Sequence, residues 1–534
     1  MTEFLTANMA PIIFVSMIVF LLSGYPVAFS LAANGIVFGL LGVALGQIPP
    51  QIFQAMPDRI YSIMASELML AIPFFTFMGL ILERSGMAED LLDTIGQLFG
   101  PVRGGLAYAV IFVGALLAAT TGIIAASVIS MGLISLPIML RYGYNPRVAS
   151  GTITASGTLA QIIPPSLVLI VMADQLGKSV GDMYRGAFVM SALLISLYVT
   201  YIFLLTRLKP GWLPALPPEA RVFREPDGRS GMRSLLVLTA VSTLIGILVC
   251  QFFLGDEALD KKITLSVMSG IVFAFIVSSL NRLSGLKLLS AMAEKVTFVL
   301  MPPLALIFLV LGSIFIGLAT PTEGGAMGAT GALIIALLRK RLNMTLLKQA
   351  MEKTMSLTTF VMFILIGARI FSLTFYAVNG HQWVERLLEA IPGGHTGFLI
   401  AVNIIIFALG CFLDYFEVVF IIVPLIGPVA EKMGIDLIWF GVLLAVNLQT
   451  SFMTLPLGFA LFFLRSVAPK SVKTGDIYLG AVPYIFIQVI AITLIVAFPW
   501  IVTIGLEKQA PVDLDTIKID VGDYGYESAY PSTQ

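Results

Sequence analysis

Long apolar stretches, separated by short groups of charged and turn-forming residues, follow one another along almost the whole chain. The hydrocarbon core of a bilayer is about 30 Å thick, so about 20 apolar residues cross it as a helix. The pattern predicts an all-α polytopic membrane protein with about twelve transmembrane helices. These spans are expected near residues 9–24, 26–46, 66–83, 147–175, 187–206, 233–254, 263–281, 290–319, 323–338, 355–378, 437–466 and 477–505.

Basic residues are concentrated in certain connections between these spans. The connection 207–233 holds six of them: Arg207, Lys209, Arg221, Arg224, Arg229 and Arg233. An excess of lysine and arginine marks cytoplasmic loops. Counting spans outward from this loop places the triplet 339–341 on the cytoplasmic side too, and predicts that both termini are periplasmic.

Two further apolar segments, 104–140 and 396–430, must begin and end on one side of the membrane to satisfy this topology. We therefore expect each to form a re-entrant helical hairpin, with its tip at residues 118–122 in the first and 413–417 in the second. Irregular backbone at membrane depth is tolerated only where it faces protein or a water-filled cavity.

The chain resembles itself at a shift of 291 residues. The matched positions are Pro137 and Pro428, Arg141 and Lys432, Gly143 and Gly434, and Pro165 and Pro456. Opposite charge bias in the two halves predicts opposite orientation, and inverted repeats of this kind are typical of secondary transporters. The predicted units are a first repeat (1–206), a loop with two additional spans (207–289), a second repeat (290–476), a last span (477–505) and an acidic tail (506–534).

Each predicted hairpin is followed by a span with a polar interruption. GTLAQIIPPS occupies residues 157–166, and NLQTSFMTLP occupies 447–456. Proline removes a backbone donor and frees carbonyl groups one turn earlier. Freed carbonyls and hydroxyl oxygens can surround a small hard cation, and the N-termini of half-helices can hold an anion. The alternative is a packing kink, with Ser and Thr bonded to their own helix.

Composition narrows the classes of function. Hydrophobic residues make up 58% of the chain and charged residues 12%, and the formal net charge is zero. No basic field favours nucleic acid. Two cysteines, two histidines and no HExxH or GxSxG pattern leave little for enzymatic chemistry, so we expect neither an enzyme nor a cofactor. Inverted repeats with hairpins argue against a channel, which needs a continuous pore.

Ionisable residues inside spans are costly and usually functional. Asp414, at the second tip, is expected to ligate Na⁺ or carry a proton, and Glu417, one turn along, to share that role or pair within the protein. Arg369 is a candidate clamp for a substrate carboxylate, with an ion pair to Glu417 or Glu323 as the alternative. Glu323 follows Pro321 at a helix start, where we favour a capping role.

With IPFFTFMGLILERSGMAEDLLD, RYGYNP before IIPPS, GLATPTEGGA, and LGCFLDYFEVV before VNLQ, the chain resembles the large membrane subunit of tripartite ATP-independent periplasmic (TRAP) transporters over most of residues 10–500. The resemblance implies an elevator-type fold, Na⁺ coupling, a small four-helix membrane subunit and a periplasmic substrate-binding protein. It also implies a small organic anion, mostly a carboxylate, as substrate.

Carried over by position, the resemblance implies cation-binding residues at each tip and break. The first set is Thr120, Thr121, Gly122, Ser156, Gly157 and Thr158, and the second is Asp414, Asn447, Gln449 and Thr450. Arg369, Gln161 and Glu417 are the expected substrate contacts. The chain departs from the family at the first tip, usually Ser-Gly-Ser, and at the second break, where Thr454-Leu455-Pro456 keeps one proline.

The predicted function is therefore import of an organic anion by Na⁺ symport across a bacterial inner membrane, with substrate supplied by a periplasmic binding protein. The alternative is a stand-alone Na⁺- or H⁺-coupled organic anion symporter.

Overall fold

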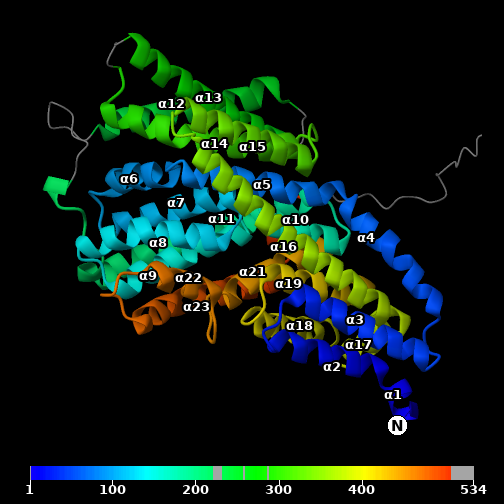
Figure 1. The fold of residues 1–534 in the computed structure, drawn as a ribbon. Helices are drawn as coiled ribbons and strands as arrows, with labels where there is room; N and C mark the ends of the chain where they lie inside the picture. The colour runs from blue at the N-terminus through cyan, green and yellow to red at the C-terminus, as the bar shows by residue number, and fades with distance from the viewer. Residues whose placement is uncertain (1, 221–230, 256–258, 285–287, 507–534) are drawn as a thin grey trace, which may run out of the picture.

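The computed structural model describes residues 2–220, 231–255, 259–284 and 288–506. Within these ranges every regular element is helical (Figure 1). Among the described residues, eight helices are long and apolar enough to cross a membrane alone, or up to ten if two bent pairs each count as one span. The predicted all-α membrane architecture is confirmed. The count is lower than twelve partly because the predicted spans 147–175 and 437–466 are each broken into two shorter helices.

One group of helices, which we call the flanking layer, comes from both halves of the chain. Within it α5 packs against α15 and α16, and α16 also packs against α3. Its members are α2 (Met9–Leu22), α3 (Val27–Ala44), α4 (Met56–Met64), α5 (Glu67–Arg84), α14 (Ala291–Phe315), α15 (Pro321–Leu338) and α16 (Met344–Ala377). The start of α15 confirms the predicted cap, because Glu323 Oε2 accepts a hydrogen bond of 2.8 Å from Thr320 N.

The remaining long helices form a second group, the central bundle. They are α7 (Gly105–Thr121), α8 (Ile124–Arg141), α9 (Pro146–Thr158), α10 (Leu167–Leu176), α11 (Val180–Leu208), α18 (Gly394–Gly410), α19 (Tyr415–Ile421), α20 (Val423–Lys432), α21 (Leu437–Ser451), α22 (Phe459–Val467) and α23 (Thr474–Ala497). All of α21 except Ile438 is buried, as is α9 from Val148 onward. These two helices form the middle of the bundle, which is why their polar residues matter.

Helices of the two halves correspond in order in the central bundle, with α19 and α20 together matching α8. Their first residues lie 289 to 294 apart, as in the pairs Gly105 and Gly394, Ile124 and Tyr415, Pro146 and Leu437, Leu167 and Phe459, and Val180 and Thr474. In the flanking layer, a 3-10 helix with α4 (together Pro50–Met64) meets α5 at a 44° bend. The counterpart in the second half is the single continuous α16.

Two amphipathic helices, α6 (Met87–Phe99) and α17 (Gly380–Glu389), connect the flanking layer to the hairpins and were not among the predicted spans. Charged residues on one face lower their mean hydropathy below that of a span. Asp90 on α6 pairs with Arg339 at 3.2 Å and with Arg341 at 3.1 Å, both beyond the end of α15. In the second half, the chain turns through 117° between α17 and α18, the first arm of the second hairpin.

The additional spans form α12 (Met232–Phe253) and α13 (Leu259–Ser284), an antiparallel pair against α14 (Figure 1). Their crossing is close because each helix presents a glycine to a backbone carbonyl of the other. A Cβ on Gly246 would lie 2.7 Å from Ser266 O, and one on Gly270 would lie 2.8 Å from Ser242 O. Neither helix has a counterpart in the repeat. Two short helices, α1 (Thr2–Ala7) and α24 (Trp500–Thr503), complete the fold.

Candidate functional site

The polar interruptions of the two halves meet inside the central bundle. The first runs from the end of α9 through a 3-10 turn (Leu159–Gln161) to α10, and the second separates α21 from α22. Their polar side chains are almost completely buried: Ser156, Thr158, Gln161, Ser166, Gln449, Thr450 and Ser451 are 0% exposed, and Asn447 is 2% exposed. Buried polar groups cost free energy unless they are hydrogen-bonded or hold a ligand.

Gln449 and Thr158 join the two interruptions directly. Gln449 Nε2 donates to Thr158 Oγ1 at 3.4 Å, and the Thr158 hydroxyl also lies 3.5 Å from Met453 Sδ. The predicted cation-binding residues Thr158 and Gln449 therefore share one polar core rather than belonging to two separate places.

The first hairpin turns at Gly122, whose φ of +59° ends α7 in the left-handed region that glycine tolerates. The hydroxyls before the turn bond within the hairpin. Thr120 and Thr121 both donate to Leu117 O, at 3.0 and 2.8 Å, and Thr121 Oγ1 lies 2.9 Å from Ser127 Oγ. The tip is thus pre-formed by its own hydroxyls.

Both helices of the first hairpin pack closely against α9 at Ser156 and Gly157, two of the predicted cation-binding positions. Gly114 on α7 abuts Ser156, since a Cβ at Gly114 would lie 2.5 Å from Ser156 Cβ, and Gly157 abuts Val128 on α8. Ser156 Oγ is buried and has no hydrogen-bond partner in the described chain. Such an oxygen can accept a cation without breaking an existing bond.

Gln161 lies in the same interruption, and neither its amide nitrogen nor its amide oxygen has a partner among the described residues. One neighbouring backbone carbonyl is instead occupied. Ser166 Oγ donates to Gln161 O at 2.8 Å, whereas the Ser191 hydroxyl, 3.0 Å from Ile162 O, makes a shorter bond of 2.7 Å to Ala187 O. Among the described residues, the Gln161 amide is thus a polar group of this break without a partner.

At the second tip, Asp414 begins α19 and is partly exposed. Glu417 Oε2 accepts a hydrogen bond of 2.8 Å from Asp414 N, so the two acids form one helix-start unit. Tyr415, which follows Asp414, anchors this tip to the other half of the chain, because its hydroxyl donates to Val168 O on α10 at 2.9 Å.

Behind the second tip, α21 bonds to the first arm of its hairpin. Asn447 Nδ2 donates to Asn403 O and lies 2.8 Å from Asn403 Oδ1. Gly410 at the end of α18 abuts Ser451, and Thr450 Oγ1 donates to Val446 O at 2.8 Å. The structure thus holds Asn447 by α18 rather than in a bond to Asp414.

Arg369 is exposed on α16, in the flanking layer. In the part of the chain that the structure describes, no ion pair joins it to Glu417 or Glu323, and those acids bond at their own helix starts. Asp174 lies near the end of α10, where its Oδ2 accepts a hydrogen bond of 2.7 Å from Gln175 Nε2. Asp174 was not singled out from the sequence, although it is the acid that closes the interrupted span 147–175.

Sequence reasoning also missed the polar residues of α11 and α23 that enclose this core. Gln488 Nε2 donates to Tyr198 OH at 2.7 Å, and Gln449 Nε2 lies 3.5 Å from the same hydroxyl. A bond of 2.7 Å joins Thr152 Oγ1 and Tyr484 OH. Gln488 could have been singled out from the sequence, because its amide lies in the middle of the otherwise apolar span 477–505.

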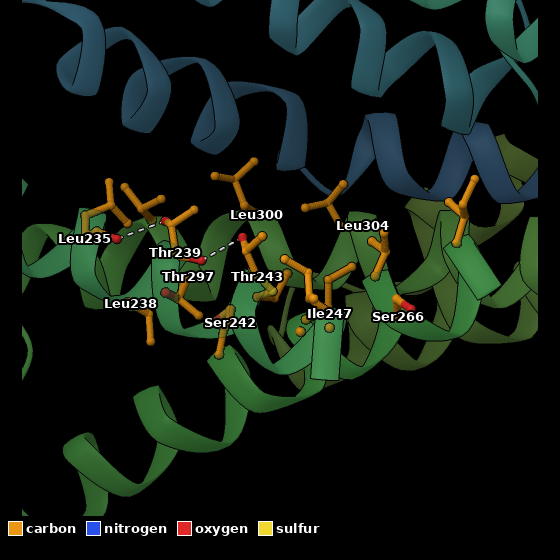
Figure 2. A pocket seen from close by; sticks show the side chains of 18 of the residues that line it. Leu235, Leu238, Thr239, Ser242, Thr243, Ile247, Ser266, Thr297, Leu300 and Leu304 are labelled. Carbon is orange, nitrogen blue, oxygen red and sulfur yellow. Dashed lines mark hydrogen bonds between the residues drawn. The ribbon is translucent and has the colours of Figure 1, made fainter. Parts of the chain in front are cut away.

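A separate cavity of about 550 Å³ lies between α12, α13 and α14 (Figure 2). Its walls are mainly apolar, with Leu235, Leu300 and Leu304 among the apolar residues and Ser242 and Ser266 among the polar ones. None of the predicted site residues lines it. The polar core between the two interruptions is therefore the candidate functional site.

Residues 14–501 match the family model of the tripartite ATP-independent periplasmic transporter, DctM component. Among curated relatives, the C4-dicarboxylate TRAP transporter large permease protein DctM of Pseudomonas aeruginosa is 26% identical over 81% of this chain and 84% of its own length. The protein of the same name from Vibrio cholerae is 25% identical over 92% and 96%. The isethionate TRAP transporter permease protein DctMQ of Oleidesulfovibrio alaskensis is 22% identical over 87% of this chain but only 61% of its own length.

Proposed function

Because this chain belongs to the family of the DctM component, the large membrane subunit of TRAP transporters, we propose that it imports an organic anion by Na⁺ symport through an elevator movement. The coarser function follows from the family: a membrane permease of the inner membrane that works with a small permease and a periplasmic binding protein to carry organic acids. Na⁺ coupling and the elevator movement are the added claims.

The observation that carries the Na⁺ claim is the polar core between the two interruptions. Ser156 Oγ, the Gln161 amide and Gln449 Oε1 are buried there without hydrogen-bond partners in the described residues. A binding site near the midplane, formed by discontinuous helices of two repeats, is the usual architecture of a secondary transporter. The tips that close over this core carry Thr120 to Gly122 in one half and Asp414 in the other.

The elevator claim is supported by how the two groups of helices are joined. The connections that follow α6 and α17 each hold a glycine with positive φ immediately before the first helix of a hairpin, Gly104 (φ +76°) before α7 and Gly393 (φ +102°) before α18. Hinges of domain movement are a few loop or element-terminal residues that absorb changes in φ and ψ. We propose that the central bundle moves past the flanking layer about these two positions.

An organic anion is the proposed substrate class. The relatives reported above are named for C4-dicarboxylates and for isethionate, which are anions of small organic acids. Arg369 is an exposed guanidinium on α16 of the flanking layer. We propose that it meets the substrate's acid group, with Gln161 and Glu417 as further contacts.

The test is uptake into proteoliposomes that contain this subunit and its small permease. Labelled C4-dicarboxylates and isethionate are supplied with and without an inward Na⁺ gradient, and with and without the binding protein. Uptake that needs both supports the proposal. Uptake with Na⁺ alone supports the stand-alone symporter, and uptake driven by a proton gradient without Na⁺ contradicts the assignment of the coupling ion.

A further inference from the structure

A cavity of about 170 Å³ lies where the connecting helix α6 meets both helices of the first hairpin. These three helices, α6, α7 and α8, pack side by side (Figure 1). Apolar side chains form most of the cavity wall. Its polar residues include Asp93 and Gln97 on α6, and Ser135 and Arg141 on α8. None of the residues proposed above for Na⁺ or substrate lines it, so its polar groups need a separate explanation.

Two polar groups of this cavity lack protein partners. Ser135 is 1% exposed, and its Oγ has no hydrogen-bond partner among the described residues. Arg141 joins no acid in an ion pair within the described part of the chain, and Asp93 in the same wall pairs instead with Lys295 on α14 at 3.1 Å. The cavity therefore offers a guanidinium and a buried hydroxyl to a ligand.

The second half of the chain shows which group fills the equivalent place there. Lys432, at the end of α20, matches Arg141 at the shift of 291 residues. Its ammonium group pairs with Glu385 and, at 3.0 Å, with Glu389, both on α17. α17 is the counterpart of α6, since each leads from the flanking layer into a hairpin. A carboxylate therefore meets the basic end of the second hairpin, whereas in the first half a cavity lined by α6 and Arg141 takes that place.

The chemistry of the cavity defines the class of ligand. A guanidinium suits a carboxylate, because its planar fork donates two parallel hydrogen bonds. Ser135 lies six residues before Arg141, about 9 Å along the helix axis, so its hydroxyl meets the other end of the ligand. Between them the walls are apolar, with Leu106 and Val110 from α7 and Ile138 from α8. The fitting ligand has a carboxylate, a short apolar body and a hydroxyl or keto oxygen at its far end.

We propose that this cavity is a regulatory site for a small hydroxy- or oxo-carboxylate, and its effect on transport rests on the function proposed above. Gly104, one of the two proposed hinges, lies between α6 and α7, and the cavity is lined by helices on both sides of it. A ligand held by Arg141 and packed against α6 joins these helices and slows the movement. Leu216, in the connection predicted to be cytoplasmic, also lines the cavity, so the ligand enters from the cytoplasm.

The experiment titrates ω-hydroxyhexanoate, as the probe, into the full-length subunit purified with its small permease, and measures binding by calorimetry. Arg141→Gln removes the charge and is expected to weaken binding at least tenfold. Gln97→Glu places a carboxylate in the cavity, as α17 does in the second half, and is expected to weaken binding as much. Gln97→Met loses the same bond to Ala220 O without adding a charge, and Arg103→Gln removes an exposed arginine outside the cavity. Both controls are expected to bind the probe as the wild type does.

Ser135→Ala tests the far end of the ligand. The wild type is expected to bind ω-hydroxyhexanoate several-fold more tightly than hexanoate, and this preference should disappear in the variant. Because Ser135 Oγ has no partner among the described residues, the substitution should leave thermal stability without the probe unchanged. An equal preference in wild type and variant would show that the hydroxyl does not contact the ligand.

Uptake into proteoliposomes, with the probe on both sides of the membrane, tests the effect on transport. Saturating probe should slow the wild type several-fold and leave the rate of Arg141→Gln unchanged. Equal binding by these two proteins, or equal inhibition by hexanol, which carries no charge, overturns the site. Binding that depends on Arg141 but does not slow uptake overturns the coupling to the hinge. If the complex carries no organic anion yet binds the probe through Arg141, the site stands and the proposed function fails.

Discussion

Gln449 and Thr158 occupy equivalent positions of the two halves, 291 residues apart, and they touch: the amide nitrogen of Gln449 donates to the threonine hydroxyl at 3.4 Å. Two equivalent positions can meet only where the axis that relates the halves passes between them. The interrupted helices of both repeats therefore pack around one point. Tyr198 and Gln488 extend this hydrogen-bond network, so side-chain hydrogen bonds join the two candidate half-sites.

This network gives a first prediction. Gln449→Leu and Thr158→Val each remove a hydrogen bond between buried neutral groups, and each is expected to cost about 1 kcal/mol. The double variant should cost less than the sum, because both changes remove the same contact. Thermal unfolding in detergent measures this coupling, and strict additivity would show that the two side chains do not interact.

Ser156 supplies a second prediction. Its hydroxyl is buried without a partner, so Ser156→Ala removes a polar group that contributes nothing to the Na⁺-free protein. Thermal stability without Na⁺ should stay equal or rise slightly, while the Na⁺ concentration for half-maximal uptake rises about tenfold. Unchanged Na⁺ activation would mean that Ser156 is only a packing residue against Gly114.

The acid at the second tip should act through its charge. Asp414→Asn keeps the shape of the side chain, and we expect the Na⁺ requirement to rise at least tenfold before folding is affected. The control is Asp436→Asn, another aspartate at a helix start, where Asp436 Oδ1 accepts from Trp439 N at 2.7 Å. A shift in Na⁺ activation for both variants would assign the effect to helix stability rather than to ion binding.

Arg369 can bind the substrate or balance Asp174, and two substitutions separate these roles. Arg369→Lys keeps the charge but loses the planar fork that suits a carboxylate, so the KM for substrate should rise at least tenfold if it is a clamp. Asp174→Asn should then leave KM unchanged. If Asp174→Asn reproduces the effect of Arg369→Lys, the arginine serves an electrostatic pair within the protein.

The proposed hinges are tested at Gly393. Its φ of +102° is poorly tolerated by any residue with a side chain, so Gly393→Ala should slow uptake several-fold and cost about 1 kcal/mol or more. Gly475→Ala, in the first turn of α23, meets no atom within 4 Å and is the control, with unchanged uptake. Equal rates for both variants would argue against a hinge at residue 393.

The sequence was informative where apolar length and proline position decide the structure. The helical hairpins at 104–140 and 396–430, the interruptions near Pro165 and Pro456, and the cap at Glu323 all follow from local pattern. The amphipathic helices α6 and α17 were not predicted, because the charged residues on one face break the continuous apolar stretch by which a span is recognised. The partners in their ion pairs are distant in sequence, as Asp90 and Arg339 are, so local pattern could not reveal these contacts.

The candidate site was harder to anticipate, because partners there depend on packing between distant helices. The resemblance implied Asn447 as a ligand beside Asp414, and the structure adds a bond from its amide nitrogen to Asn403 that the sequence did not suggest. The sequence offered Glu417 and Glu323 as partners for Arg369, whereas both acids bond at their own helix starts. The residue types at the interruptions were correct guides to polarity, but not to which atoms remain available.

The unequal lengths of neighbouring helices in the flanking layer have a consequence for the surrounding lipid. At 1.5 Å per residue, the 18 residues of α15 span about 27 Å. Residues 354–377 of α16, beyond its last charged residue before Arg369, span about 36 Å. A bilayer about 30 Å thick matches neither, and mismatch is relieved by tilting helices and by thinning or thickening the membrane locally. Neighbouring helices of one layer therefore match bilayers of different thickness, and we expect either tilt of these helices or an uneven membrane thickness around them.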